Sequence, residues 1–171
     1  MASPVAAVDP QSTLPMIDTL RSCAIDVFDT MVGTALGEST PLAGDALRPQ
    51  SNVVAQIGFG GSRSGLVVFY ATFDGAAHIT RALLCMEPTD VPSPPEIADA
   101  VGEITNMVAG SFRTRMANEG DAWAISIPTV TMGSDFYMTP LSDGSRTMLP
   151  FRMGDHEIFV ELVVTSKARR A

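Results

Sequence analysis

Residues 94–117, PPEIADAVGEITNMVAGSFRTRMA, have the pattern of one long amphipathic helix. Two prolines open the stretch, where their fixed φ and missing N–H suit a first helical turn, and Ser93 is in position to cap it. At about 100° per residue, five apolar residues fall in one stripe: Ile97, Val101, Ile104, Val108 and Phe112. The stretch therefore predicts a helix that packs one face on a core, with the rest of the chain arranged around it.

The opposite face of this helix carries Asp99, Glu103, Asn106 and Gly110. Asparagine is a mediocre helix former, and a glycine inside a helix costs about 1 kcal/mol relative to alanine. Glu103 and Asn106 stand three residues apart, so their side chains project side by side above an uncrowded surface. Such a pair fits either another protein's active site or an ordinary solvated face, and spacing alone favours the solvated face.

The run GEITNMVAG at residues 102–110 resembles the signature helix of the CheX/CheC chemotaxis phosphatases, with its Glu-x-x-Asn motif followed by a glycine. The resemblance extends more loosely over most of the chain, as an order of elements. It implies a protein phosphatase that hydrolyses the aspartyl phosphate of a CheY-like response-regulator receiver domain. Glu103 and Asn106 would be its catalytic residues: Asn106 orients the attacking water, and Glu103 pairs with the receiver's active-site lysine.

The same resemblance implies that the chain has no cofactor of its own and that Mg²⁺ belongs to the receiver. It also implies a homodimer, formed through surfaces away from Glu103 and Asn106. In double-motif members of the family an early helix carries a second Glu-x-x-Asn, which is missing here, so the chain resembles the single-site, CheX type. A non-catalytic interaction module in two-component signalling is the alternative, and a structural or ligand-binding dimer is a third.

Length and composition bound the fold and the partners. With 171 residues, 46% of them hydrophobic, the chain is long enough for one domain with a real core. A net charge of −8 argues against binding to nucleic acid or to anionic membranes. We expect one domain over residues 13–166, a flexible amino-terminal segment over 1–12 and a short basic tail over 167–171.

Nothing in the sequence indicates export, a membrane span or a metal centre. The first dozen residues lack the basic start and apolar run of a secretory signal, and no stretch approaches the roughly 20 apolar residues that span a bilayer. Cys23 and Cys85 are expected to be free, buried thiols of a cytoplasmic protein. His78 and His156 are far from the cysteines and from each other in sequence, so a metal site would need residues from remote parts.

Two further helices are predicted. Between residues 14 and 36, Met16, Leu20, Cys23, Val27 and Met31 recur at helical spacing, with Gly33 or Gly37 as candidate ends. The second of these helices is predicted over residues 73–86, with Asp74 as its cap.

The remaining segments read as loops and strands. Residues 38–50 and 87–95 are polar or proline-rich connections. Strands are predicted at residues 53–59, 65–72, 123–131 with an interruption at Pro128, 147–153 and 157–165. Glycine-containing turns join the first two strands and the last two as hairpins. The predicted fold class is α+β, with helices packed on an antiparallel sheet.

Overall fold

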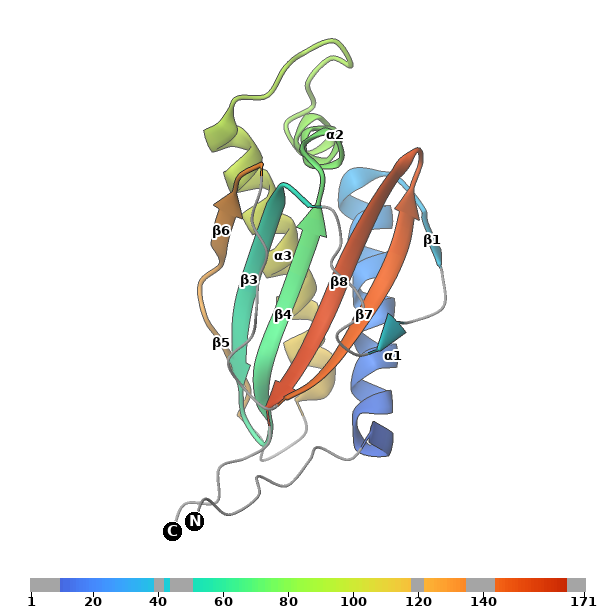
Figure 1. The fold of residues 1–171 in the computed structure, drawn as a ribbon, viewed down its shortest axis with the longest axis vertical. Coiled ribbons are helices and arrows are strands. Elements are labelled where there is room, and N and C mark those ends of the chain that lie inside the picture. The colour runs from blue at the N-terminus through green and yellow to red at the C-terminus, as the bar shows by residue number, and fades with distance from the viewer. Residues whose placement is uncertain (1–9, 39–41, 44–50, 118–121, 135–143, 166–171) are drawn as a thin grey trace.

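The computed structural model describes residues 10–38, 42–43, 51–117, 122–134 and 144–165. Figure 1 shows α1 and α3 side by side against one face of a twisted sheet, with α2 at one end of it. The three helices are α1 (Pro10–Val27), α2 (Phe73–Leu83) and α3 (Pro94–Met116). This arrangement confirms the predicted α+β class.

The sheet has eight antiparallel strands in the order β1-β7-β8-β4-β3-β5, with β2 also on β7 and β6 also on β3. Its strands are β1 (Leu36–Glu38), β2 (Leu42–Ala43), β3 (Val53–Gly60), β4 (Ser64–Ala71), β5 (Ala124–Ile125), β6 (Thr129–Met132), β7 (Gly144–Met153) and β8 (His156–Thr165). Both predicted hairpins, β3–β4 and β7–β8, are present. The gap between β5 and β6 spans the predicted interruption at Pro128.

The first helix begins at Pro10, earlier than predicted, and ends at Gly33, one of its two predicted ends. α1 passes into a π-helical turn, Phe28–Val32, and Gly33 closes it in the left-handed conformation with φ 66°. The wider π turn shifts the phase of the helix, so Phe28 and Val32 face the core and Met31 is 39% exposed. Met31, which recurs at helical spacing with Met16, Leu20, Cys23 and Val27, therefore does not share their burial. The strands β1 and β2 form where the sequence predicted the end of this helix and the loop over residues 38–50.

The limits of the domain were expected at residues 13 and 166. α1 begins at Pro10, inside the segment that we expected to be flexible. Residues 1–9 and 166–171, including the predicted basic tail, lie outside the described residues.

The second helix differs from prediction at both ends. Its cap is Thr72, whose Oγ1 accepts a hydrogen bond from the Gly75 N–H, and Asp74 lies within the first turn. At the other end Cys85 adopts a left-handed conformation with φ 51°. The N–H of Met86 then bonds to the carbonyl of Arg81, which closes the helix as a Schellman motif without a glycine. Cys85 is exposed there, so only Cys23 of the two free thiols is buried as predicted.

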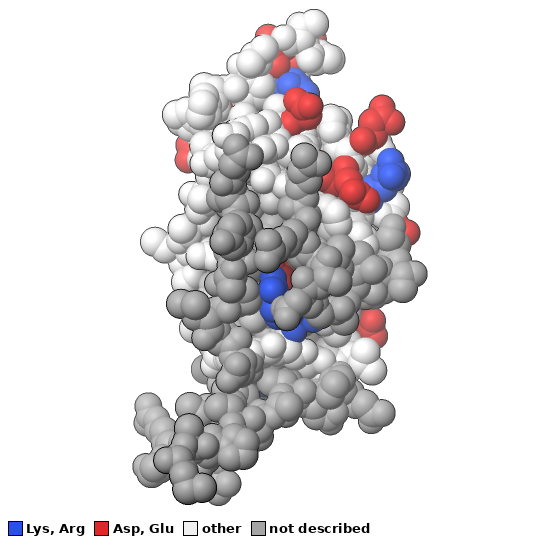
Figure 2. All heavy atoms as spheres, viewed as in Figure 1, with Lys and Arg blue, Asp and Glu red and all other residues white. Residues whose placement is uncertain are grey.

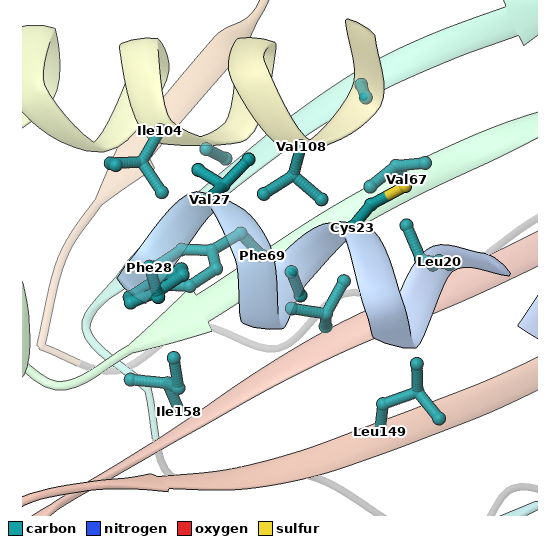
Figure 3. Close-up of a cluster of buried hydrophobic side chains, with 14 of the residues drawn as sticks. Leu20, Cys23, Val27, Phe28, Val67, Phe69, Ile104, Val108, Leu149 and Ile158 are labelled. Atoms are coloured by element: carbon teal, nitrogen blue, oxygen red, sulfur yellow. The ribbon is translucent and has the colours of Figure 1, made fainter. Parts of the chain in front are cut away.

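The main core lies between the helices and the sheet (Figure 3). Phe28 stacks on Phe69 of β4, with ring centroids 6.0 Å apart. Cys23 is fully buried, and burial raises the pKa of its thiol. Ten labelled side chains from the helices and the sheet meet in this view: Leu20, Cys23, Val27, Phe28, Val67, Phe69, Ile104, Val108, Leu149 and Ile158. Each is at most 8% exposed, so this cluster holds α1 and α3 on the sheet.

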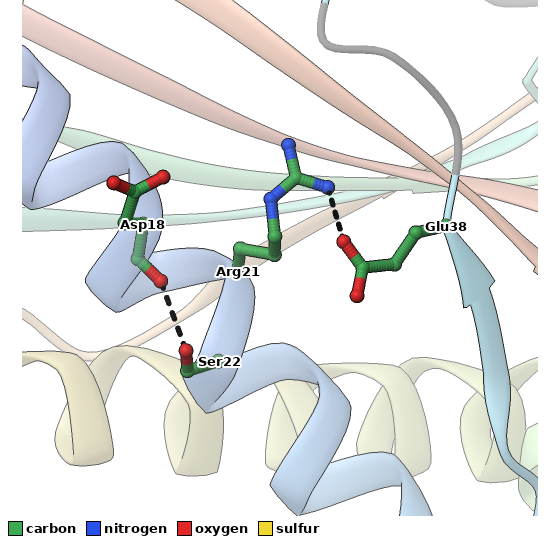
Figure 4. A network of polar contacts seen from close by, with 4 residues as sticks. All are labelled: Asp18, Arg21, Ser22 and Glu38. Carbon is green, nitrogen blue, oxygen red and sulfur yellow. Dashed lines mark hydrogen bonds and ion pairs between the residues drawn. The ribbon is translucent and has the colours of Figure 1, made fainter.

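Two ion pairs hold α1 to its neighbours. Arg21 Nη1 lies 3.0 Å from Glu38 Oε2 of β1 (Figure 4), and Arg115 Nη2 of α3 lies 2.5 Å from Asp26 Oδ2. Ser22 Oγ also donates to the carbonyl of Asp18 one turn earlier. Because both ion pairs are partly or largely exposed, each is worth at most about 1 kcal/mol. Apolar burial therefore dominates the docking of α1.

A second, smaller cluster on the sheet encloses a charged residue. Glu161 of β8 is only 2% exposed and accepts hydrogen bonds from Tyr70 Oη at 2.6 Å and Arg146 Nε at 2.5 Å. Burial, together with the Glu161 charge, raises the pKa of Tyr70 far above its usual range. The buried carboxylate is thus compensated from both neighbouring strands, β4 and β7.

The described surface is mixed in charge. On the face shown in Figure 2, acidic side chains gather toward one end and a small basic group lies near the middle. Among the helices in the described part of the chain, none is long and apolar enough to cross a membrane.

The fold brings together the two histidines that the sequence leaves far apart. His78 on α2 and His156 at the start of β8 have ring centroids 5.3 Å apart, with the planes tilted by 48°. Burial lowers the pKa of His78, and the nearby His156 and Arg81 lower it further. A positive charge on His78 is therefore unfavourable in the folded protein.

This histidine pair predicts a loss of stability in mild acid. Because the pKa of His78 is lower in the folded chain than in the unfolded chain, the unfolded chain binds more protons as the pH falls through about 6.5. We expect His78→Gln to flatten the fall in unfolding free energy between about pH 7.5 and about pH 5, as measured by urea denaturation. His156→Gln should flatten it less, because it leaves the burial of His78 in place. An unchanged pH slope in His78→Gln would contradict this assignment.

Candidate functional site

The candidate site stands on α3, whose start is strongly defined. Ser93 is the N-cap, Pro94 and Pro95 fill the first turn, and the Glu96 carboxylate accepts hydrogen bonds from the Ser93 N–H at 2.7 Å and the Ser93 hydroxyl at 2.6 Å. The hydroxyl first, and then the backbone N–H, lowers the pKa of Glu96. The predicted cap is confirmed, and it fixes where the helix begins.

The predicted apolar stripe of α3 is buried along its whole length. Its five members are at most 7% exposed: Ile97, Val101, Ile104, Val108 and Phe112. Thr105 is also buried, and its hydroxyl donates a hydrogen bond to the carbonyl of Val101 at 2.7 Å. Since burial of five side chains fixes the rotation of the helix about its axis, it also fixes which residues face outward.

Glu103 and Asn106 lie together on the outward side, as predicted. Glu103 is exposed and Asn106 is half-buried. Within the described part of the chain, neither side chain makes a hydrogen bond or ion pair. A carboxylate and a carboxamide therefore stand next to each other on the outer side of α3, accessible to a partner. The pair is not buried against the protein's own strands, which would have excluded docking.

No side chain projects from α3 at Gly110, one turn beyond Asn106. A Cβ built at this position would meet nothing within 4 Å. The chain's own packing therefore does not require glycine here, although alanine would favour the helix by about 1 kcal/mol. The space above Gly110 is therefore open on the outer side of the helix.

Gly102 brings a second segment against α3. A Cβ on Gly102 would lie 3.4 Å from Val130 Cγ2 and 3.8 Å from Pro128 Cγ, so the connection from β5 to β6 packs directly on the helix backbone. Sequence reasoning gave Gly102 no role beyond its place in the motif run. The available signal was its position inside a helix, which often marks a close approach.

Three aromatic rings pack together where the carboxyl-terminal half of α3 meets the segment leading into β5. Phe112 of α3 meets Trp123 at 6.1 Å and Phe59 of β3 at 5.7 Å, and Phe59 stacks on Trp123 at 5.5 Å. Such pairs add about 0.5–1.5 kcal/mol each beyond their buried area. The carboxyl-terminal half of α3 and the start of β5 are therefore held together.

The Glu103 and Asn106 side chains can contribute only hydrogen bonds and charge. Asn106 can both donate and accept hydrogen bonds, while the Glu103 carboxylate accepts them or pairs with a cation. Among the described residues no group of three or more His, Cys, Asp or Glu side chains could hold a metal ion. The pair can therefore position and orient groups that a partner supplies.

Comparison with known proteins identifies the family of this chain. The model of the family described as chemotaxis phosphatase CheX matches residues 53–152, which is more than half of the chain and includes α3 with Glu103 and Asn106. A search of the curated proteins found no match.

Several solved structures share the fold. A chemotaxis protein CheX from Desulfovibrio desulfuricans is 23% identical with a TM-score of 0.78, over 88% of this chain and 99% of that one. CheX from Vibrio vulnificus is 24% identical with a TM-score of 0.77, over 88% and 99%. A CheX-CheY-BeF3-Mg+2 complex from Borrelia burgdorferi contains a chain that is 20% identical with a TM-score of 0.74, over 88% and 97%.

The family match spans β3 through most of β7, and the helix that it contains presents Glu103 and Asn106 on its outer side. The chain therefore belongs to the chemotaxis phosphatase CheX family.

Proposed function

We propose that this protein is a phosphatase that hydrolyses the aspartyl phosphate of a CheY-like response-regulator receiver domain. The observation that carries the proposal is the outward Glu103–Asn106 pair on the firmly packed α3 of a CheX-family chain. A relative of the same fold was solved in complex with CheY, BeF3 and Mg+2, which supports a receiver as partner. The cytoplasmic location stays a prediction.

The reaction needs little chemistry from this chain. An acyl phosphate is already labile, so positioning and charge control supply most of the required rate increase. When α3 docks on the phosphorylated receiver, Asn106 holds a water in line with the phosphorus through its carboxamide. The water attacks, the bond from phosphorus to the aspartyl oxygen breaks, and inorganic phosphate and a free aspartate carboxylate result.

Glu103 and the receiver share the control of charge. In this proposal Glu103 forms an ion pair with the receiver's active-site lysine and sets the orientation of α3 in the site. Mg²⁺ would be held by the receiver and would supply positive charge next to the phosphoryl group. Gly110 acts as a clearance position, since a side chain at that point would stand on the docking side of the helix.

The alternative proposal is an interaction module that binds a receiver without hydrolysis. Both proposals use the same exposed pair, so the structure alone favours neither. Release of inorganic phosphate from a phosphorylated receiver separates them: the phosphatase accelerates release, and the module leaves it unchanged.

We predict that Asn106→Ala slows receiver dephosphorylation at saturation by about a hundredfold or more, equivalent to about 2.7 kcal/mol. The lost interaction matters mainly along the reaction path, so binding to a beryllofluoride-activated receiver should stay within a few-fold. Asn106→Gln is the matched control, because it keeps the carboxamide and displaces it by one methylene; it should also be slow. Thermal melts should show no loss of stability in Asn106→Ala, since the side chain lies outside the apolar stripe.

Hydrolysis by Asn106→Ala at the wild-type rate would show that Asn106 has no catalytic role. The interaction module would then be the better account of the pair.

We predict that Glu103→Ala weakens receiver binding by about tenfold, equivalent to about 1.4 kcal/mol, and slows turnover as well. The difference in affinity between wild type and variant should shrink as salt rises, because salt screens an ion pair at an interface. Asp99→Ala is the matched control: Asp99 is exposed on the same face one turn earlier. If both variants lose affinity equally, general acidity of the face explains the effect and the specific lysine contact is wrong.

We also propose a homodimer formed through surfaces away from Glu103 and Asn106. Two edges of the sheet offer such surfaces in principle, β1 with β2 at one side and β5 with β6 at the other. β8 lies inside the sheet between β7 and β4, so its backbone is already paired on both sides. Light scattering from micromolar to near-millimolar concentration should give twice the chain mass of 18.1 kDa. A monomer mass throughout that range would overturn the proposal.

A further inference from the structure

Arg113 is an exposed basic residue in the last turn of α3. Its side chain takes part in none of the hydrogen bonds and ion pairs found within the described part of the chain. The residues three and four positions away on the helix are all uncharged, so the helix itself offers it no partner. The nearby Arg115, by contrast, is paired with Asp26 of α1. The fold therefore uses Arg115 to hold two helices together and leaves the Arg113 guanidinium available.

Arg113 lies on the same face of α3 as the candidate site. It follows Asn106 by seven residues, which is about 10.5 Å along the helix and about 20° around its axis. Gly110 stands between them, and the space above Gly110 is open. Helical side chains lean toward the amino terminus, so the side chain of Arg113 leans toward this opening. A group of a docked protein above Gly110 would therefore lie between the carboxamide and the guanidinium.

The other charged residues of this face are acidic. Asp99 and Glu103 are exposed, and neither forms an ion pair among the described residues. The whole chain also carries a net charge of −8. In the proposed function this face meets an anionic phosphoryl group and the carboxylates that are the usual protein ligands of Mg²⁺. Because two acidic surfaces repel each other, a positive group on this face favours their approach.

We propose that Arg113 forms an ion pair with a carboxylate of the receiver and so sets the direction in which the receiver lies on α3. The inference rests on the proposed function and adds a residue that selects the partner. Glu103 presents a negative charge, and Arg113 presents a positive charge about 15 Å further along the helix. A receiver turned end for end would bring like charges together, so the two contacts admit one direction of docking.

The position of Arg113 also has a purely structural explanation. The carboxyl-terminal end of a helix is the negative end of its dipole, where a basic side chain is stabilising. Lysine serves the dipole as well as arginine does, and the dipole affects the free energy of unfolding. Only a contact with the receiver makes the dissociation constant depend on Arg113 together with one particular carboxylate of the partner. Affinity and its coupling to that carboxylate therefore separate the two explanations.

The first test compares Arg113→Gln with Arg113→Lys and Arg152→Gln. Arg152 is the matched control: it is exposed and unpaired among the described residues, but it alternates on β7 with the buried Phe151 and Met153 and so faces away from the helices. The probe is each CheY-like receiver domain of the source organism with Mg²⁺ and beryllofluoride. We expect Arg113→Gln to raise Kd about fivefold, and added salt should reduce this difference. Arg113→Lys should keep most of the affinity, and Arg152→Gln should keep all of it.

A double-mutant cycle then identifies the carboxylate. Each surface Asp or Glu around the phosphorylated aspartate of the receiver, other than its Mg²⁺ ligands, is replaced by alanine. One replacement should weaken binding of wild type about fivefold and binding of Arg113→Gln hardly at all. Arg113→Glu should bind the normal receiver poorly and should regain affinity when that carboxylate is replaced by lysine.

The outcomes separate this inference from the proposed function. If wild type binds and dephosphorylates a receiver but Arg113→Gln matches it in Kd, or no receiver carboxylate couples to Arg113, the contact is wrong and the phosphatase stands. If wild type binds a receiver without releasing phosphate, the phosphatase is wrong, and the cycle still decides the contact. Equal losses in Arg113→Gln and Arg152→Gln would show an effect of net charge and overturn the inference. If no receiver binds wild type, both are overturned.

Discussion

Burial of the apolar stripe of α3 is the interaction on which the rest of this structure depends. Ile104 and Phe112 are fully buried against the sheet and its neighbours, which sets both the depth and the rotation of the helix. Once the rotation is set, Glu103 and Asn106 must face outward. A site made of two polar side chains on the outer side of a helix keeps its geometry only if that helix cannot turn or slide, and this core provides that rigidity.

In the proposed function the site is one half of an active centre, and the partner supplies the other half. Glu103 and Asn106 offer hydrogen bonds and one charge, so the phosphoryl group, metal ion and leaving group of the proposed reaction all come from the partner. In the proposed reaction the surface that binds the partner is therefore part of the catalytic apparatus. The open space at Gly110 then matters as well as the polar pair, because it affects how closely two proteins can meet.

Most helices and strands could be predicted from local hydrophobic periodicity. The prediction failed where a single residue or turn changed the local backbone geometry. The strands of both hairpins and the limits of α3 follow from patterns within a few residues, which sequence displays directly. Met31 continues the helical spacing of the buried residues before it, but it is exposed because a π turn shifts the helical phase. The end of α2 was misplaced because Cys85 takes a conformation usually left to glycine. Neither the π turn nor the left-handed Cys85 alters the apolar pattern of the helix that precedes it, so hydrophobic periodicity could not predict them.

The sequence by itself determined the helix, its buried stripe and the placement of Glu103 beside Asn106, because residues three and four apart in a helix always share a face. Only the tertiary structure decided what lies beside that pair. The contact of Pro128 with Gly102 brings the connection from β5 to β6 onto the same helix, and elsewhere in the fold the pairing of His78 with His156 also joins residues that are distant in the chain. Such contacts depend on strand register and helix packing, and no local spacing encodes them.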